Sequence, residues 1–222
     1  MHEVAIRREI IERILARRGR LHLFERLEAK RTALVVIDMQ NAFVAPGAPI
    51  EVPGARDIVP AINRTAAELR KRGAPVIWVL HENSAGWAGF FSVFVKPEDR
   101  ERAAAALCSG HELQKLWREL DVALGDLTVA KNRYSALIAG SSDLGTVLKQ
   151  RGIDTLLIAG TKTNVCCEST ARDAMMLDFK VVMVSDCCAA LSDDEHRATL
   201  ETHIQQFGDV GTADEVLAWL KK

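Results

Sequence analysis

The apolar run Ala33-Leu34-Val35-Val36-Ile37, which stops at Asp38, constrains the fold of this chain more than any other feature of its sequence. An unbroken run of branched apolar residues is typical of a strand buried on both faces, as in a parallel sheet covered by helices. Further apolar segments of strand length follow at residues 75–80, 127–130, 155–159 and 180–184. Helical patterns occur at residues 55–72, 141–151, 166–178, 193–206 and 212–220. This alternation predicts an α/β fold with a doubly wound (Rossmann-like), mostly parallel sheet, flanked by helices and joined by right-handed crossovers.

Two stretches fall outside this alternation. Residues 84–110 are rich in glycine and aromatic residues and are expected to form a loop with a short alanine-rich helix at its end. Residues 3–29 have apolar side chains at helical spacing, and Gly19 is expected to divide them into two helices. We therefore predict one domain over residues 1–222, with residues 1–31 as an N-terminal helical extension that packs on the domain or on another subunit.

Charge and hydropathy exclude several kinds of partner. The chain has 29 Lys+Arg and 30 Asp+Glu, so its net charge of -1 provides no long-range attraction to nucleic acid or to an anionic membrane. No apolar run reaches the roughly 20 residues that span a bilayer. The N-terminus lacks the residue order of a signal peptide, so a cytoplasmic location is expected. The five cysteines include two adjacent pairs, a pattern that favours reduced thiols over a disulfide framework.

Polar side chains follow the predicted strands at the points where the strands end. Asp38 follows the first strand, His81 the second, Lys131 the third and Asp186 the fifth, while the turn after the fourth leads to Cys166. Ligands of open α/β sheets bind outside the carboxyl ends of the strands, so these side chains are expected to converge. Together they supply a nucleophile, a possible base and a cationic neighbour.

Cys166 has the features expected of the nucleophile. It begins a predicted helix, whose dipole favours thiolate over thiol, and Lys131 is expected to add to this effect. Free backbone N–H groups at that terminus can hold an oxyanion, and Asp38 can take the thiol proton. Each residue also has a purely structural alternative, since an Asp often caps a turn, a Lys is often a surface charge and a Cys is often a small core residue.

Three segments together resemble the isochorismatase-like cysteine hydrolases, and within that family they resemble the ureidoacrylate amidohydrolases in particular. They are the strand and following turn at residues 33–43, the lysine segment that begins at Lys131, and the segment Gly160-Thr161-Lys162-Thr163-Asn164-Val165-Cys166-Cys167-Glu168-Ser169-Thr170. The resemblance covers roughly residues 32–210 and implies a catalytic triad of Asp38, Lys131 and Cys166. It also implies a cis peptide bond at Thr161–Lys162 and an oxyanion hole formed by the backbone N–H groups of Lys162 and Cys166.

The resemblance implies a substrate class as well. It points to cleavage of a C–N bond in a small amide, ureido or carbamoyl compound through a thioester, with substrate contacts from Phe43, Asn83, Trp87 and Tyr134. Nicotinamidases of the family hold a metal through an Asp-x-His motif after the first strand, and this chain has no histidine there. We therefore expect no metal and no cofactor. Family members are often homodimers or homotetramers, and the same is expected here.

Alternatives and smaller features remain open from the sequence. The chain can instead be a vinyl ether hydrolase of the isochorismatase type, which does not need Cys166, or a non-catalytic subunit of the same fold. Lys162 departs from the small or apolar residue usual at its position, and its side chain is expected to face solvent. His196 and His203 lie seven residues apart on one helix face and are also expected to be exposed.

Overall fold

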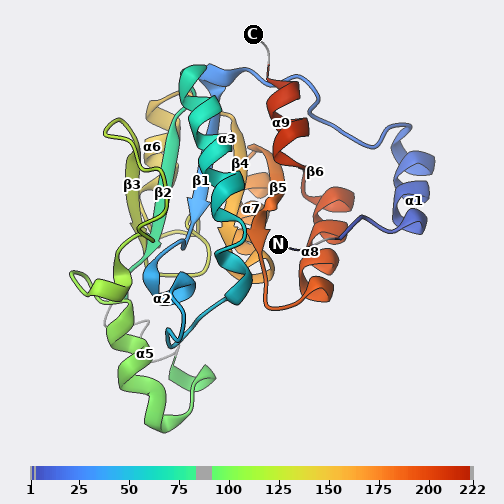
Figure 1. Ribbon diagram of the computed structural model, residues 1–222. Helices are drawn as coiled ribbons and strands as arrows, with labels where there is room; N and C mark the ends of the chain where they lie inside the picture. The colour runs from blue at the N-terminus through green and yellow to red at the C-terminus, as the bar shows by residue number, and fades with distance from the viewer. Residues whose placement is uncertain (1, 3, 84–91, 221–222) are drawn as a thin grey trace.

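Six parallel strands form the single sheet of the computed structural model, which describes residues 2, 4–83 and 92–220 (Figure 1). The strands are β1 Thr32–Ile37, β2 Val76–His81, β3 Leu127–Lys131, β4 Thr155–Thr161, β5 Lys180–Ala189 and β6 Asp209–Gly211. Their order in the sheet is β3-β2-β1-β4-β5-β6, and every neighbouring pair is parallel. The doubly wound fold class predicted from the sequence is confirmed. The sixth strand was not predicted, because its three residues are too few to show a periodicity.

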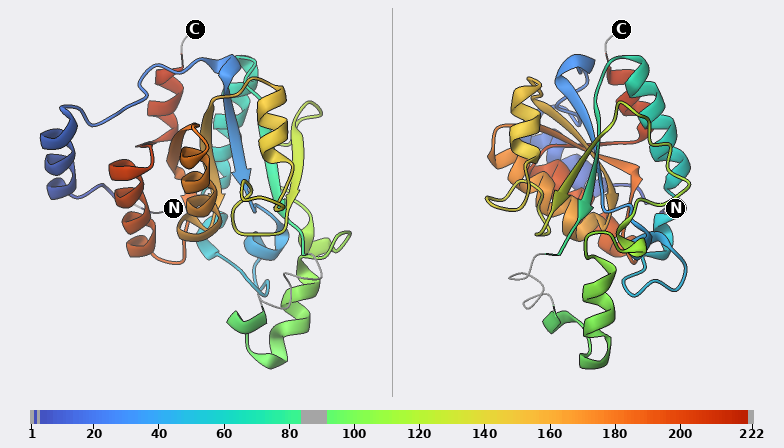
Figure 2. Two further views of the ribbon diagram at one scale, coloured as in Figure 1. Left: turned by 180° about the vertical axis from the view of Figure 1, so that it is seen from behind. Right: turned by 90° about the vertical axis from the view of Figure 1, so that its left-hand side faces the viewer.

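Helices cover both faces of this sheet. They are α1 Arg8–Arg18, α2 Asn41–Val44, α3 Val59–Lys71, α5 Arg100–Ala106, α6 Leu144–Gln150, α7 Glu168–Met176, α8 Asp193–Gln206 and α9 Ala213–Trp219. One face is covered by α3 and α9, and the other by α6, α7 and α8 (Figures 1 and 2). The short helix α2 and the alanine-rich helix α5 lie beyond the carboxyl ends of the strands (Figure 1). No helix among the described residues is long and apolar enough to cross a membrane.

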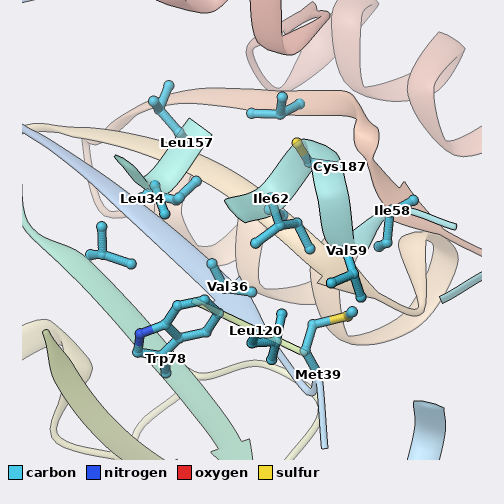
Figure 3. Close-up of a cluster of buried hydrophobic side chains, with 14 of the residues drawn as sticks. Leu34, Val36, Met39, Ile58, Val59, Ile62, Trp78, Leu120, Leu157 and Cys187 are labelled. Carbon is cyan, nitrogen blue, oxygen red and sulfur yellow. The ribbon is translucent and has the colours of Figure 1, made fainter. Parts of the chain in front are cut away.

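The central strand β1 explains why its sequence is apolar without interruption. Leu34 and Val36 point to the face of α3, where they pack with Ile62 and Trp78 (Figure 3). The alternate residues of β1 belong to a second cluster on the opposite face, with residues from α6 and α7. Each fully buried Val, Leu or Ile side chain contributes about 1.5–3 kcal/mol. Both faces of the strand are therefore selected for apolar residues.

The strand order reverses between β1 and β4, and the backbone there has a conformation that brings the ends of the two strands together. Asp38 follows β1 directly with a φ of 54°. Gly160 of β4 lies beside Ile37 in the sheet, and a Cβ atom at Gly160 would lie 2.0 Å from the carbonyl oxygen of Ile37. Only glycine permits this approach, which brings the ends of β1 and β4 together. Crevices at such reversal points are where α/β sheets of this order bind ligands.

The described part of the N-terminal extension contains one α-helix, so the prediction of two helices was half right. Helix α1 ends at Gly19, which has a φ of 73° and donates its N–H to the carbonyl of Leu15. Beyond Gly19 the backbone N–H groups of Leu23 and Phe24 donate to the buried carboxylate of Asp209. These contacts replace the i→i−4 bonds that a second helix needs. The extension therefore runs along the β6 edge of the sheet, with α1 beside α8 (Figures 1 and 2).

Candidate active site

A buried ion pair lies where β1 and β3 end. The Nζ atom of Lys131 is 2.9 Å from Oδ2 of Asp38, and both side chains have no solvent exposure. Lys131 Nζ also donates to the carbonyl of Arg133 at 3.1 Å and lies 3.2 Å from Nδ1 of His81. Three acceptors thus surround the three N–H bonds of the ammonium, which offsets much of the cost of burying it.

Cys166 lies beside this ion pair. It belongs to a single π-helical turn, Thr163–Cys167, that joins β4 to α7, and its thiol is within hydrogen-bonding reach of Asp38 and Lys131. The turn is tied to the segment after Lys131, because Thr170 donates its hydroxyl to the carbonyl of Cys166 and accepts the N–H of Ala136. The structure therefore brings together the three residues that the sequence analysis selected.

The electrostatics of the trio differ from the sequence-based expectation of a thiolate. Burial, together with the Asp38 carboxylate, raises the pKa of Cys166 well above its usual value, and Lys131 offsets this only in part. Burial also raises the pKa of Asp38. Burial by itself lowers the pKa of Lys131, but the charge of Asp38 outweighs it, so the pKa is raised overall. The resting site is thus a charged Asp38–Lys131 pair beside a neutral thiol.

His81 is the fourth polar residue at the bottom of the site, and the sequence analysis gave it no role. It ends β2 and lies beside Lys131 in the sheet register. Burial, and next the charge of Lys131, lower its pKa well below the usual value, so the imidazole is neutral. Because Nδ1 faces the ammonium of Lys131, Nδ1 is the acceptor and the proton is on Nε2. The signal that could have identified His81 is its place directly at the end of the second strand.

Gln40 fixes the backbone of His81. Its side-chain oxygen accepts the N–H of His81 at 2.7 Å, and its Nε2 donates to the carbonyls of His81 at 3.0 Å and Gln114 at 2.8 Å. A buried amide with these bonds satisfied holds the ends of β1 and β2 in a fixed relation. Gln40 was also missed, although it lies within the segment at residues 33–43 that carries the family resemblance.

A pocket of about 330 Å³ opens at Cys166. Most of its described lining is apolar, and its polar lining consists of Glu51, His81, Tyr134, Lys162 and Cys166. The apolar lining residues are Phe43, Ile50, Val52, Phe94, Val95, Leu107, Val165 and Leu191. Asp38 and Lys131 do not line it and lie behind the thiol. The volume matches a small molecule rather than a polymer.

The predicted substrate contacts fall into three groups. Phe43 and Tyr134 line the pocket, and burial raises the pKa of the half-buried Tyr134 phenol. The side chain of Asn83 instead donates to the carbonyl of Ala104 at 2.7 Å, which holds the helix α5. Trp87 lies outside the described residues, as do Phe90 and Phe91.

The peptide bond between Thr161 and Lys162 is cis, as the family resemblance implied. The carbonyl of Lys162 accepts the N–H groups of Val165 at 3.1 Å and Cys167 at 3.2 Å, which closes the turn around Cys166. Lys162 is partly buried and is among the residues that line the pocket, and the solvent-facing orientation of its side chain stays a prediction.

Two histidines of α8 correct another expectation. His196 and His203 are each 1% exposed, because this face of α8 packs on the sheet. His196 Nδ1 lies 2.9 Å from the Thr163 hydroxyl, and burial lowers the pKa of both histidines to about 4. Among the described residues, no three His, Cys, Asp or Glu side chains gather closely enough to hold a metal ion.

The fold and the site together define a class of protein. This is a doubly wound α/β protein whose small-molecule pocket opens at the reversal point of a parallel sheet and has a thiol among its lining groups. The profile of the isochorismatase domain matches residues 32–215. The chain therefore belongs to the isochorismatase family and is a hydrolase of that family.

Named relatives agree with this assignment. The uncharacterized isochorismatase family protein YwoC of Bacillus subtilis is 34% identical over 199 residues, which cover 88% of this chain and 97% of YwoC. The ureidoacrylate amidohydrolase RutB of Variovorax paradoxus is 31% identical over 206 residues, covering 85% of this chain and 81% of RutB. A crystal structure of a cysteine hydrolase from Pseudomonas syringae pv. phaseolicola matches with a TM-score of 0.79 at 29% identity, covering 89% of this chain and 95% of that one.

Proposed function

We propose that this protein is a cysteine-dependent amidohydrolase that cleaves a C–N bond of a small amide, ureido or carbamoyl compound. One observation carries the proposal. The Cys166 thiol lines a small pocket, and behind it lies a buried acid–lysine pair within hydrogen-bonding reach. A buried ion pair costs free energy to desolvate and is weak evidence of stabilisation alone. A role in transferring the thiol proton explains why this pair lies beside a thiol in the pocket.

The first step is attack by sulfur on the substrate carbonyl carbon. The thiol is neutral at rest, so its proton must leave as the S–C bond forms. Asp38 accepts that proton, and the raised pKa of its carboxyl makes it a stronger base than an exposed aspartate. Lys131 keeps its proton throughout and stabilises the negative charge that develops on sulfur.

The oxyanion of the tetrahedral intermediate is held by the backbone N–H groups of Lys162 and Cys166. The tight turn between these residues supports this role, because the Lys162 carbonyl is turned inward to accept the N–H groups of Val165 and Cys167. Preorganised backbone donors of this kind are worth about 10²–10³ in turnover. The C–N bond then breaks, and the leaving nitrogen takes the proton held by Asp38.

Hydrolysis of the thioester repeats the same chemistry with water. Asp38 accepts a proton from water as the new C–O bond forms, and the C–S bond breaks to release the carboxylic or carbamic acid. The proton returns to sulfur, which restores the neutral thiol. Each step uses side chains and backbone groups of this chain together with water. The neutral His81 keeps Lys131 in place through Nδ1.

The pocket supports a substrate with a short apolar portion next to the scissile carbonyl. Phe43 and Tyr134 contribute aromatic surface, and the Tyr134 hydroxyl is a candidate partner for ureido N–H or carbonyl groups. The relatives named RutB act, by their name, on ureidoacrylate. From these names we propose only the kind of bond that this protein cleaves, a C–N bond next to a carbonyl.

The test measures ammonia release from amides, ureido acids and biuret by the wild type and the Cys166→Ala and Cys167→Ala variants, with chelator present. Cys167 is a matched control, because it is buried beside Cys166 and bonds to the carbonyl of Ala159 instead. We expect Cys166→Ala to lose roughly 10⁴–10⁶-fold in turnover, and Cys167→Ala to keep it. The wild type should also accumulate an acyl adduct on the Cys166 peptide, visible by mass spectrometry. Undiminished turnover by Cys166→Ala contradicts the proposal.

A further inference from the structure

The N-terminal extension lies outside the segment that matches the isochorismatase domain, which begins at residue 32. Its helix α1 packs on the outer side of α8, so that α8 lies between α1 and the sheet (Figures 1 and 2). Arg7 donates its backbone N–H and its guanidinium to Glu201 of α8, whose side chain is 4% exposed. Arg18 donates to the carbonyl of Ile204 at 3.0 Å. The extension is therefore fastened to α8 at more than one point.

His2 fastens the extension at the start of α8 by three contacts. The backbone N–H of Ala190 donates to its Nε2 at 2.9 Å, so Nε2 is the acceptor and the proton is on Nδ1. Nδ1 donates to the carboxylate of Asp193 at 2.5 Å. The ring also stacks on His196, with centroids 4.5 Å apart and planes 18° apart. Because the His2 side chain is only 10% exposed, these contacts place it within the packed part of the molecule.

The bond to Ala190 reaches the wall of the pocket. Ala190 directly follows β5 and precedes Leu191, which lines the pocket. Leu191 is 56% exposed, so neighbouring side chains do little to hold it and its place depends on the backbone of this loop. His2 supplies the acceptor for the N–H of that backbone. The extension therefore helps to fix one side of the pocket.

The stacked His196 reaches the turn that carries Cys166. Its Nδ1 lies 2.9 Å from the hydroxyl of Thr163, the first residue of that turn, and both side chains are buried. Burial lowers the pKa of His196 to about 4, so the ring is neutral. A second bond from α8 joins the hydroxyl of Thr199 to the carboxylate of Glu168, directly after the turn, at 3.0 Å. The inner side of α8 thus holds both ends of the turn.

We propose that the N-terminal extension positions the Cys166 turn and the pocket wall, with His2 as the positioning residue that connects it to both. The stack on His196 holds that imidazole against Thr163, and the bond to Ala190 holds the loop after β5. His2 is not among the described residues that line the pocket, so it takes no part in bond breaking. The role of Cys166 as a nucleophile rests on the proposed function. A displacement of a reacting atom by about 1 Å can cost about 10²-fold in rate, so support of this kind acts on kcat.

Hydrogen exchange followed by mass spectrometry tests the positioning without a substrate. We expect His2→Ala to raise exchange about three- to tenfold in peptides covering residues 161–168 and 189–192, and to leave β1 unchanged. His2→Phe keeps a ring that can stack on His196 but cannot accept the N–H of Ala190, so it should raise exchange at 189–192 alone. Arg8→Ala is the matched control, because Arg8 pairs with Glu12 on the exposed side of α1, and it should change neither segment.

Two outcomes of the exchange measurement overturn the proposal. One is unchanged exchange in both segments of His2→Ala. The other is a rise of the same size in β1, because that indicates a general loss of stability rather than local loosening of the turn and the loop.

Kinetics test the consequence for turnover. On a compound of the amide and ureido panel that the wild type hydrolyses, His2→Ala should lower kcat roughly 5–30-fold, and Arg8→Ala should stay within about twofold. His2→Phe should keep kcat and raise KM, since only the pocket wall is loosened. The double variant His2→Ala/Thr163→Val should lose less than the product of the two single losses, because both changes weaken one connection to the turn. Losses that multiply contradict transmission through His196 and overturn the proposal.

The two measurements separate the failures of the two proposals. Local loosening in His2→Ala, without ammonia release from any compound by the wild type, supports the positioning and contradicts the proposed function. Turnover that depends on Cys166, with exchange and kcat unchanged in His2→Ala, supports the proposed function and overturns the positioning. Local loosening that leaves kcat unchanged also overturns it, because the nucleophile is then held without the extension.

Discussion

The floor and the wall of the pocket are built from different parts of the chain. We define the floor as Asp38, His81, Lys131 and Cys166, three of which end or directly follow strands while the fourth lies in the turn after β4. The wall consists of Phe43, Ile50, Glu51, Phe94, Val95, Lys162 and Leu191, which belong to connecting segments and to the short helices beyond the strand ends. The floor is polar, and its ammonium is surrounded by three acceptors, whereas the wall is mostly apolar.

This difference indicates that the floor carries out the chemistry and that the wall selects the substrate. Strand ends are held in register by the sheet, so the floor can keep atoms within hydrogen-bonding distance, as chemistry requires. Connecting segments can change without disturbing the sheet, so the wall is where substrate preference is set. If the division holds, floor substitutions should act on kcat and wall substitutions on the choice of substrate.

After Cys166→Ala, the largest effect is expected from removing the cation of the floor with Lys131→Met. Turnover should fall by roughly 10³–10⁴-fold, because Asp38 and the thiol lose their positive neighbour. At neutral pH the free energy of unfolding should fall by about 3–5 kcal/mol, because the Asp38 carboxylate is left buried without a partner. Steady-state kinetics and urea unfolding measure the two effects.

The pH dependence of that variant gives its control. Without Lys131, the pKa of buried Asp38 lies further above its unfolded value of about 3.9, so the folded state binds the extra proton. The stability that the variant retains is therefore greatest at acid pH and declines as pH rises through the folded pKa. The double variant Asp38→Asn/Lys131→Met should recover stability at neutral pH, but not turnover. A single variant as stable as the wild type at pH 8 would show that the floor is not held by this pair.

The strand-based half of the molecule was predictable from the sequence. The unbroken apolar run of β1 and the acid that follows it can both be read from a short stretch of sequence. Because ligands of open α/β sheets bind at the carboxyl ends of the strands, such local signals also predict where the site lies. Helix α8 was predicted to the residue, because Ser192 caps its start by accepting the N–H of Glu195. The exposure of His196 and His203 was predicted wrongly, because helical spacing shows that they share a face but does not show what that face packs on.

The wall was largely not predictable. Ile50, Phe94 and Leu191 have no periodic pattern around them, and they meet only because three connecting segments cross the same sheet edge. The prediction of a second N-terminal helix was wrong for a related reason. The backbone N–H groups of Leu23 and Phe24 donate to the carboxylate of Asp209, which is far away in the sequence. Contacts between residues far apart in the sequence can override a local pattern, and a short segment of sequence does not predict them.

A smaller effect is expected where the floor meets the wall, from His81→Leu. The variant removes the Nδ1 acceptor of Lys131 and the imidazole surface of the pocket. A hydrogen bond to a charged group is worth about 1.5–3 kcal/mol, so kcat/KM should fall roughly 10–100-fold. Because the lowered pKa of His81 keeps it neutral, His81→Gln should restore part of the activity without shifting the pH profile. A profile that loses a limb near pH 6 in His81→Gln would instead show that His81 titrates during turnover.

The smallest effect, and the sharpest test of the division, is expected from Glu51→Gln. The carboxylate of Glu51 has its pKa lowered by the Gly47 N–H and by Arg56, so it is charged throughout the working range. Removing that charge leaves Arg56 unpaired and makes the pocket more positive, while the glutamine oxygen can still accept the Gly47 N–H. The ratio of kcat/KM for 3-ureidopropanoic acid to kcat/KM for its neutral analogue 3-ureidopropan-1-ol should rise about two- to fivefold at low salt, and the gain should disappear at high salt. Turnover of the neutral alcohol should stay within about twofold, since the Asp38–Lys131 pair and its contacts with Cys166 do not include Glu51. A tenfold loss of turnover on the neutral compound would mean that the wall takes part in the chemistry, and the separation of floor from wall would have to be abandoned.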